Sequence, residues 1–140
     1  VQFLGLVVSK MTGGIVPPSF VLFGGVGAIG VLVHMATLLA TLSLTNANFV
    51  WSQAIATLVA MTTNFLLNNE FTFSAKKLKG WRLPLGLVSF YVICSIGAIA
   101  NISVASWIWQ MDRSAFVGGI TGALMSMVFN YAVSRAITWR

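Results

Sequence analysis

The chain has 140 residues, of which 58% are hydrophobic and 7% are charged. A soluble domain needs far more charge to cover its surface, so the composition argues against that class and predicts a single domain built for lipid. The formal net charge is +6, but the basic residues cluster between and beside apolar runs, which suits an anionic membrane face and argues against a nucleic-acid partner.

Residues 1–19 come before the first long apolar run, and we expect a juxtamembrane linker there. Pro17 and Pro18 stand at the end of this segment, where the start of a helix tolerates proline. The membrane domain is expected to cover residues 20–140.

Four uncharged stretches approach or exceed the roughly 20 residues that a helix needs to cross a bilayer. Their interiors must be helical, because hydrocarbon offers no partner for unpaired backbone groups. These predicted spans are residues 20–44, 49–67, 84–109 and 114–134.

The links between the spans predict how the chain crosses the membrane. Links 45–48 and 110–113 are short, so the helices on either side should be antiparallel neighbours, whereas the longer link 68–83 is basic. Seven of the eight basic residues fall on one side of the predicted membrane, and the positive-inside rule places that side, with both termini, in the cytoplasm. Arg113 alone falls on the other side.

Two parts of the sequence resemble each other, at about residues 20–73 and 87–139. NFLLNNEFTF at residues 64–73 aligns with NYAVSRAITW at residues 130–139, and Phe23, Gly30 and His34 align more weakly with Phe90, Gly97 and Asn101. An even number of spans separates the copies, so they run in the same direction. The predicted fold is therefore all-α and membrane-integral, with four transmembrane helices in two tandem helical hairpins that form a parallel repeat.

Each copy carries a stripe of small and polar residues on one helix face, because residues four apart share a face. Such a stripe either packs helices closely or lines a polar path that ends in a head-group site, and both roles can hold together. The stripes are Ser52, Ala56, Ala60, Asn64 and Asn68 in span two, and Gly118, Gly122, Ser126, Asn130 and Ser134 in span four.

Other polar residues are candidates for binding. His34 and its repeat partner Asn101 lie in mid-span, where the simplest role is a hydrogen bond to another helix and the alternative is proton relay or substrate contact. Glu70 is expected to pair with a nearby lysine or arginine, with a direct role in coupling or sugar binding as the alternative. The basic link should set orientation and attract anionic lipid or a lipid phosphate, through Lys76, Lys77, Lys79 and Arg82.

Catalytic and metal-binding patterns are absent from the sequence. One histidine, one cysteine (Cys94) and two distant acids offer no metal-ligand cluster, nucleophile–base pair or paired carboxylates. We therefore expect no cofactor, no metal and no enzymatic activity from this chain alone.

The spans, the repeated hairpin and the two asparagine–aromatic span ends resemble the GtrA-like family over about residues 19–140. The most specific element is the family pattern N-F-x-x-N-R-x-W/F-T-F, which residues 64–73 match except that Asn69 stands where the family has arginine. In the second copy Asn130, Arg135, Thr138 and Trp139 match, while Ser134 replaces the second asparagine. Arg135 is thus the one arginine that the two copies keep.

The resemblance implies a small polytopic protein that moves a polyprenyl-phosphate-linked sugar across the cytoplasmic (inner) membrane. Together with the polar residues singled out above, the candidate head-group contacts are Asn64, Asn68, Asn69, Glu70, Asn130, Arg135, His34 and Asn101. The implied partners are the lipid-linked sugar, membrane lipids and a family 2 glycosyltransferase, fused or separate. Residues 1–20 resemble the linker to such an enzyme, which suggests a membrane domain from a bifunctional protein.

Other functions remain open from the sequence. The main alternative is a non-transporting anchor that presents a polyprenyl acceptor to a glycosyltransferase. A small multidrug-resistance-type exporter ranks last, because its first span would carry an acid and this one carries none. Four helices enclose little volume, so a homo-oligomer is expected.

Overall fold

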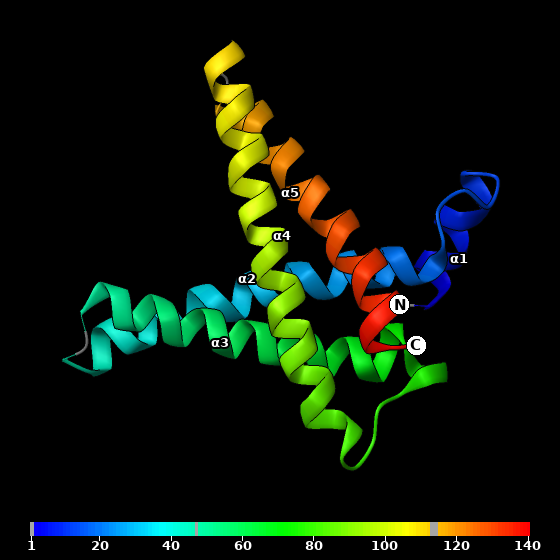
Figure 1. The fold of residues 1–140 in the computed structure, drawn as a ribbon, viewed down its shortest axis with the longest axis horizontal. Helices are drawn as coiled ribbons and strands as arrows, with labels where there is room; N and C mark the ends of the chain where they lie inside the picture. The colour runs from blue at the N-terminus through cyan, green and yellow to red at the C-terminus, as the bar shows by residue number, and fades with distance from the viewer. Residues whose placement is uncertain (1, 47, 113–114) are drawn as a thin grey trace. The chain divides into compact units, whose positions relative to one another are not determined.

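The computed structural model describes residues 2–46, 48–112 and 115–140 (Figure 1). This part of the chain is helical, without strands, so the all-α prediction is confirmed. Its α-helices are α1 (Gln2–Met11), α2 (Pro18–Leu44), α3 (Phe49–Leu67), α4 (Arg82–Asp112) and α5 (Ala115–Val133). Three shorter turns are the π-helices η1 (Asn68–Thr72) and η3 (Ser134–Thr138) and the 3-10 helix η2 (Ser74–Lys76).

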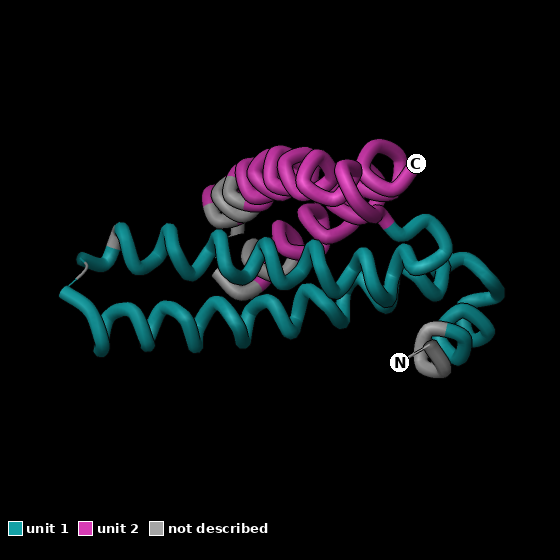
Figure 2. Tube along the Cα trace, turned by 90° about the horizontal axis from the view of Figure 1, so that it is seen from below, with its two compact units in different colours: residues 1–77 teal, residues 78–140 magenta. Residues whose placement is uncertain are grey.

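The chain divides into two compact units, residues 1–77 and 78–140 (Figure 2). In unit 1, α2 and α3 pack side by side as a helical hairpin, and α1 contacts α2. Unit 2 is the hairpin of α4 and α5, which ends in η3. The expected linker, residues 1–19, thus contains a helix of its own in unit 1.

Local sequence explains where the hairpin helices begin. α2 begins at Pro18 after Pro17, because the fixed φ of proline suits the first helical turn and its missing N–H would have no partner there. α3 begins after Asn48, whose side chain accepts a hydrogen bond from the backbone N–H of Trp51 at 3.0 Å. Before α4 the chain turns at Gly80, whose φ of 54° is one that glycine adopts without steric penalty.

The long helices expose apolar surface. α2 and the described stretch 82–101 of α4 are long and apolar enough to span a bilayer, each with a mean hydropathy of 2.0. Of the most apolar 18-residue stretch of each helix, only 28% in α2 and 22% in α4 is buried within the chain. The core helix of a soluble protein would instead be mostly buried. The apolar faces fit a lipid environment. Spanning by α3 and α5, and the sides of the termini, stay predictions.

Small residues let the helices of each hairpin approach closely. In unit 1 a Cβ added to Gly30 of α2 would overlap the Asn64 amide of α3. The same contact recurs in unit 2, where Gly97 of α4 meets the Asn130 amide of α5. A second close contact in unit 2 places Gly122 against Asn101, including its backbone oxygen. The hairpins are therefore held by glycines that receive the asparagine side chains.

The predicted stripes lie largely inside the structure. Gly118 falls outside the residues whose burial is described. The buried members are Ser52, Ala56, Ala60, Asn68, Gly122 and Ser134, and the half-buried ones are Asn64, Ser126 and Asn130. Helix packing, the first of the two predicted roles, accounts for Asn64 and Asn130 at their glycines.

Replacing Gly30 or Gly97 with alanine should destabilise its hairpin by about 1–3 kcal/mol, the usual range for overpacking a close contact. Gly122→Ala should be at the upper end, because the added Cβ would lie 2.7 Å from a backbone oxygen that cannot rotate away. Unfolding of the purified chain in mixed micelles measures these free energies.

Gly25→Ala is the matched control for this prediction. Gly25 also lies within α2, but nothing stands within 4 Å of an added Cβ. Alanine favours a helix over glycine by up to about 1 kcal/mol, so this variant should be neutral or stabilised. Equal losses for Gly25→Ala and Gly30→Ala would contradict the packing role of Gly30.

Candidate functional site

Both hairpins end in a π-helical turn that follows the second helix directly. The backbone N–H of Phe73 donates to the oxygen of Asn68 at 2.8 Å, and that of Trp139 donates to the oxygen of Ser134 at 3.0 Å. Each bond spans five residues, one more than in an α-helix. Such π-turns widen the helix and occur often at functional sites.

An aromatic contact fixes each π-turn to the first helix of its own hairpin. Phe73 meets Phe23 edge-to-face with ring centroids 6.4 Å apart, and Trp139 meets Phe90 in the same way at 5.8 Å. All four rings are buried. The two hairpin ends are thus built alike, at the positions that the sequence alignment pairs.

The polar contacts of the two π-turns differ. In η1 the Thr72 hydroxyl donates to Oδ1 of Asn68 at 2.7 Å. In η3 Ser134 stands in place of that asparagine, and the Thr138 hydroxyl lies 2.7 Å from the Ser89 hydroxyl of α4 instead. The position equivalent to Ser89 in the first hairpin is occupied by Leu22, which offers no such partner.

The contact between Thr138 and Ser89 belongs to a longer chain of hydrogen bonds. Ser89 donates its one hydroxyl proton to the backbone oxygen of Gly86 at 3.0 Å. Thr138 must then donate to Ser89, so a directed chain runs from η3 to the backbone of α4. This chain ties the end of unit 2 together.

Four buried side-chain oxygens in the described residues have no hydrogen-bond partner. They are Oδ1 of Asn64 and Asn130 and Oγ of Ser52 and Ser134. Buried polar atoms are usually satisfied, so acceptors without partners inside apolar hairpins need an explanation such as a ligand donor. The amide of Asn130 also donates from Nδ2 to Ser126 Oγ at 3.4 Å.

His34 and Asn101 both face the second helix of their own hairpin. Nε2 of His34 lies 3.5 Å from the Thr57 hydroxyl of α3, and Asn101 packs on Gly122 of α5. His34 thus lies at hydrogen-bond distance from another helix, as predicted, whereas the hydrogen bond predicted for Asn101 stays a prediction.

Two neighbouring polar residues of η1, Asn69 and Glu70, differ in their exposure to the surroundings. Asn69, where the family pattern has arginine, is buried with 3% of its surface exposed. Glu70 is exposed and forms an ion pair with Lys77, so the predicted pairing with a nearby base is confirmed. An exposed pair of this kind contributes little to stability.

Arg135 is held on its own helix. Its Nη1 donates to the Tyr131 hydroxyl at 3.2 Å, although the arginine itself is exposed. Phe65 and Asn69 occupy the equivalent positions in the first hairpin, and neither can form this contact. Arg135 therefore occupies an environment that the first hairpin lacks.

A pocket of about 310 Å³ lies at the end of unit 2. Two exposed arginines, the hydroxyl chain and exposed apolar side chains line it together. Its lining residues are Leu78, Arg82, Leu85, Gly86, Ser89, Ile137, Thr138 and Arg140. This volume is at the lower end of the range for small-molecule sites, and the lining combines cationic, hydroxyl and apolar groups.

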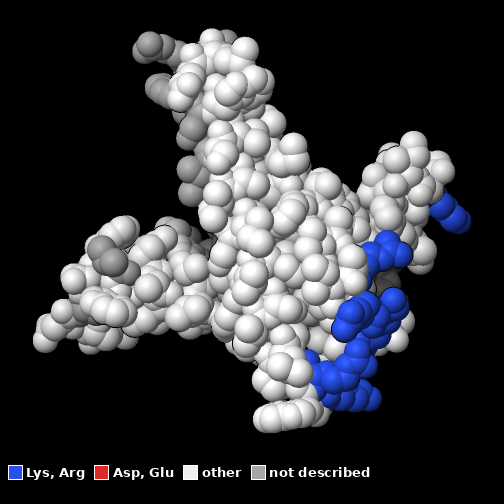
Figure 3. Space-filling view, in the orientation of Figure 1, with Lys and Arg blue, Asp and Glu red and all other residues white. Residues whose placement is uncertain are grey.

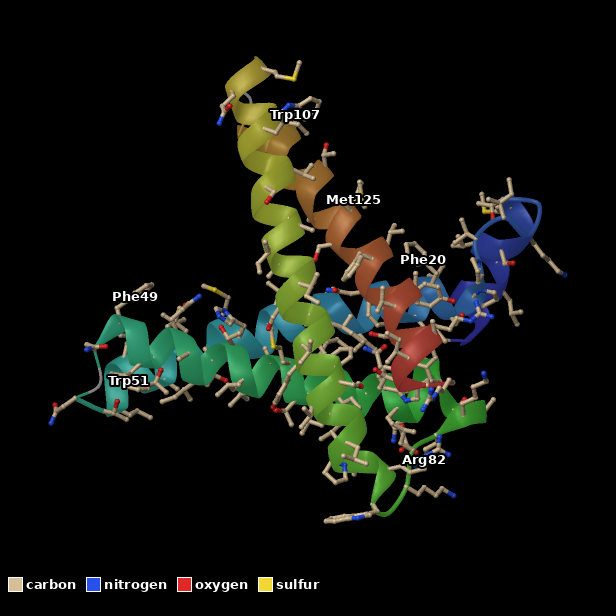
Figure 4. All side chains as sticks on the ribbon, viewed as in Figure 1. Phe20, Phe49, Trp51, Arg82, Trp107 and Met125 are labelled. Atoms are coloured by element: carbon tan, nitrogen blue, oxygen red, sulfur yellow. The ribbon has the colours of Figure 1, made fainter. Side chains whose placement is uncertain are left out.

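The position of the arginines makes this end of the hairpin electropositive. Figure 4 shows Arg82 at the start of α4 and Trp107 toward the far end of the same helix. Lys79 precedes α4 and Arg135 lies in η3, and apart from these and the two arginines of the pocket the sequence of the described part of unit 2 has no lysine or arginine. Figure 3 shows in blue the lysines and arginines that are visible from one side. In unit 1, Lys76 and Lys77 likewise follow η1.

The sequence identified part of this pocket. Arg82 was predicted to attract phosphate, and Thr138 belongs to the repeated motif, but Ser89 and Arg140 were not singled out as binding residues. A signal for Ser89 exists, because a hydroxyl there aligns with Leu22 in the otherwise similar first copy. For metals, no three His, Cys, Asp or Glu side chains gather in the described part of the chain.

The chain matches a known protein family. The family model described as GtrA/DPMS, transmembrane domain, matches residues 22–139, which include both π-turns and all of the two hairpins except the first four residues of α2. A search of curated proteins finds none that matches the chain.

Replacing Ser89 with alanine should destabilise unit 2 by about 1 kcal/mol, since the buried Thr138 hydroxyl would lose its acceptor. Unfolding in mixed micelles measures the change in free energy. Ser95→Ala is the matched control, because Ser95 is exposed on the same helix and bonds only the backbone oxygen of Tyr91. If Ser89→Ala is no less stable than Ser95→Ala, the hydroxyl chain does not hold this end.

Proposed function

Because the chain belongs to the GtrA/DPMS transmembrane-domain family, we propose that it moves a polyprenyl-phosphate-linked sugar across the cytoplasmic membrane. The flipped lipid would supply the synthesis of a cell-surface polysaccharide or glycolipid. In this proposal the polyprenyl tail stays in the bilayer while the sugar phosphate follows the polar stripes of the hairpins.

The observation that best supports transport is the pair of buried acceptors in the hairpins. Oδ1 of Asn64 and Oδ1 of Asn130 lie inside apolar helical hairpins without a hydrogen-bond partner. A sugar carries several hydroxyl donors, and such donors would satisfy these oxygens once the helices of a hairpin part at Gly30 and Gly97. A protein that serves only as an anchor has no need of unpartnered acceptors there.

The basic residues have a separate role in this proposal. Lys76 and Lys77 follow the first hairpin, and Lys79 precedes the second. These lysines would attract the lipid phosphate, and the attraction of each to an anionic surface contributes about 1 kcal/mol. With both termini in the cytoplasm, these residues would collect the lipid on the side where it is made. The chain itself would change no covalent bond, and a family 2 glycosyltransferase, fused or separate, would supply the lipid-linked sugar.

Replacing both Asn64 and Asn130 with alanine should lower the rate of lipid-linked sugar translocation by at least tenfold, because the polar path loses both acceptors. The measurement uses vesicles that contain the purified chain and a polyprenyl-phosphate sugar, and follows the fraction that a membrane-impermeant oxidant reaches. Asn46→Ala is the control, since Asn46 is exposed in the turn between α2 and α3.

The same variant separates transport from the anchoring alternative, in which the chain presents a polyprenyl acceptor to a glycosyltransferase. Exposed apolar faces and basic hairpin ends would serve that role equally well. In cells, intact synthesis with lost translocation supports transport. If the double variant folds and translocates at the wild-type rate, these asparagines have no transport role.

Self-association would build a wider path than one chain offers, so we propose a homo-oligomer. Amine-reactive crosslinking in native membranes should give species larger than one chain, through the exposed lysines at the hairpin ends. Dilution of the membrane with excess lipid before crosslinking controls for random collisions. Crosslinked membranes that contain monomers alone would contradict the assembly.

A further inference from the structure

We propose that the pocket of unit 2 is the subsite that binds the phosphate of a membrane lipid, with Arg82 and Arg140 as its ligands. The identity of the biological lipid in this inference rests on the proposed function. The binding of a phosphate is argued from the pocket alone. It assigns the phosphate to these two arginines, whereas the family pattern directs attention to Arg135.

The charges of the pocket support an anionic ligand. Arg82 and Arg140 both line it, and among the described side chains the one acid, Glu70, pairs with Lys77 in unit 1. The two guanidinium groups thus have no carboxylate partner in that part of the chain. Each can offer a planar pair of N–H donors, a geometry that matches the oxygens of a phosphate.

The donors of the pocket come from side chains and not from the start of α4. The backbone N–H groups of Arg82 and Leu83 already donate to the oxygens of Lys79 and Gly80, and Pro84 has no N–H. Ser89 and Thr138 have committed their protons within the hydroxyl chain. These two residues therefore shape the pocket wall, and the arginines are left to bind the anion.

The apolar part of the lining favours a lipid phosphate over a free one. Leu85 and Ile137 line the pocket and remain 68% and 56% exposed, so they offer apolar surface next to the arginines. A soluble phosphate makes no use of such surface, whereas the first carbons of an acyl or prenyl chain would cover it. The phosphate and the start of its tail would then lie in one site.

Arg135 has a weaker claim on the same phosphate. It does not line the pocket, and its guanidinium group donates to Tyr131 on the same helix. The equivalent positions of the first hairpin differ from the pocket, since Leu22 and Ser74 stand where unit 2 has Ser89 and Arg140. The subsite is thus a property of the second hairpin.

Binding of tritiated polyprenyl monophosphate tests the subsite, with the full chain in nanodiscs of zwitterionic lipid. Arg82→Gln and Arg140→Gln should each weaken binding about tenfold, the loss of one charge-assisted contact. Arg82→Lys and Arg140→Lys should also weaken it, by at least threefold, because lysine keeps the charge but not the paired donors. Lys10→Gln removes an exposed charge on α1 and should leave binding unchanged.

Competitors identify the source of the phosphate. Unlabelled polyprenyl monophosphate should displace the probe, while millimolar inorganic phosphate and the uncharged polyprenol should not. Displacement by inorganic phosphate would overturn the lipid assignment, and equal displacement by polyprenol would overturn recognition of the phosphate.

Three further outcomes would overturn the proposal. One is wild-type affinity in folded Arg82→Gln and Arg140→Gln, as judged by helical content. A second is wild-type affinity in both lysine variants, which would reduce the site to a general positive surface. The third is a tenfold loss in Arg135→Gln without loss in the pocket variants.

The translocation assay separates this proposal from the proposed function. If the wild type binds the lipid through both arginines but does not flip it, the subsite holds and transport is wrong. If it flips the lipid and the pocket variants bind and flip like the wild type, transport holds and the subsite is wrong.

Discussion

The insertion of an asparagine amide against a glycine is the contact on which each hairpin depends. Asn64 meets Gly30 and Asn130 meets Gly97, with no room for a Cβ on either glycine. In lipid there is no hydrophobic driving force that brings apolar side chains of two helices together. Close packing of this kind is therefore what holds membrane helices together. The same contact buries an amide oxygen without a partner, so the packing of the hairpin and its polar interior arise from one pair of residues.

The two hairpins share this framework but differ in chemistry at their ends. Each places a π-turn after its second helix and fixes it with an aromatic pair. The first closes its turn internally through Thr72 and Asn68, whereas the second reaches across to Ser89 of the neighbouring helix. As a consequence, charged and hydroxyl groups line a pocket at the end of the second hairpin.

Much of the helical architecture could be predicted from the sequence, because long apolar runs in a chain with so little charge admit few other structures. The predicted span 49–67 has the bounds of α3, and span 84–109 lies within a longer α4. The π-turns were not predicted, since a five-residue change of helical pitch leaves no mark in the pattern of apolar residues. Crossing of the membrane by α3 and α5 still rests on that pattern.

The candidate site was harder to predict. Ser89 and Thr138 are 49 residues apart, and only the closed hairpin brings them together. Arg135 stood out because a motif contains it, yet a motif does not show that Tyr131 holds its side chain. Arg140 follows the motif directly and gains its significance from Arg82, which shares its pocket.

The unequal ends of the hairpins also set a stoichiometry. A perfectly repeated protein would offer two equivalent head-group sites in every chain. Here Leu22 and Ser74 replace the hydroxyl and the guanidinium group that complete the pocket of unit 2. At the proposed subsite, a ligand that requires both arginines would therefore saturate at one molecule per chain, and the proposed assembly would hold as many head groups as it has subunits.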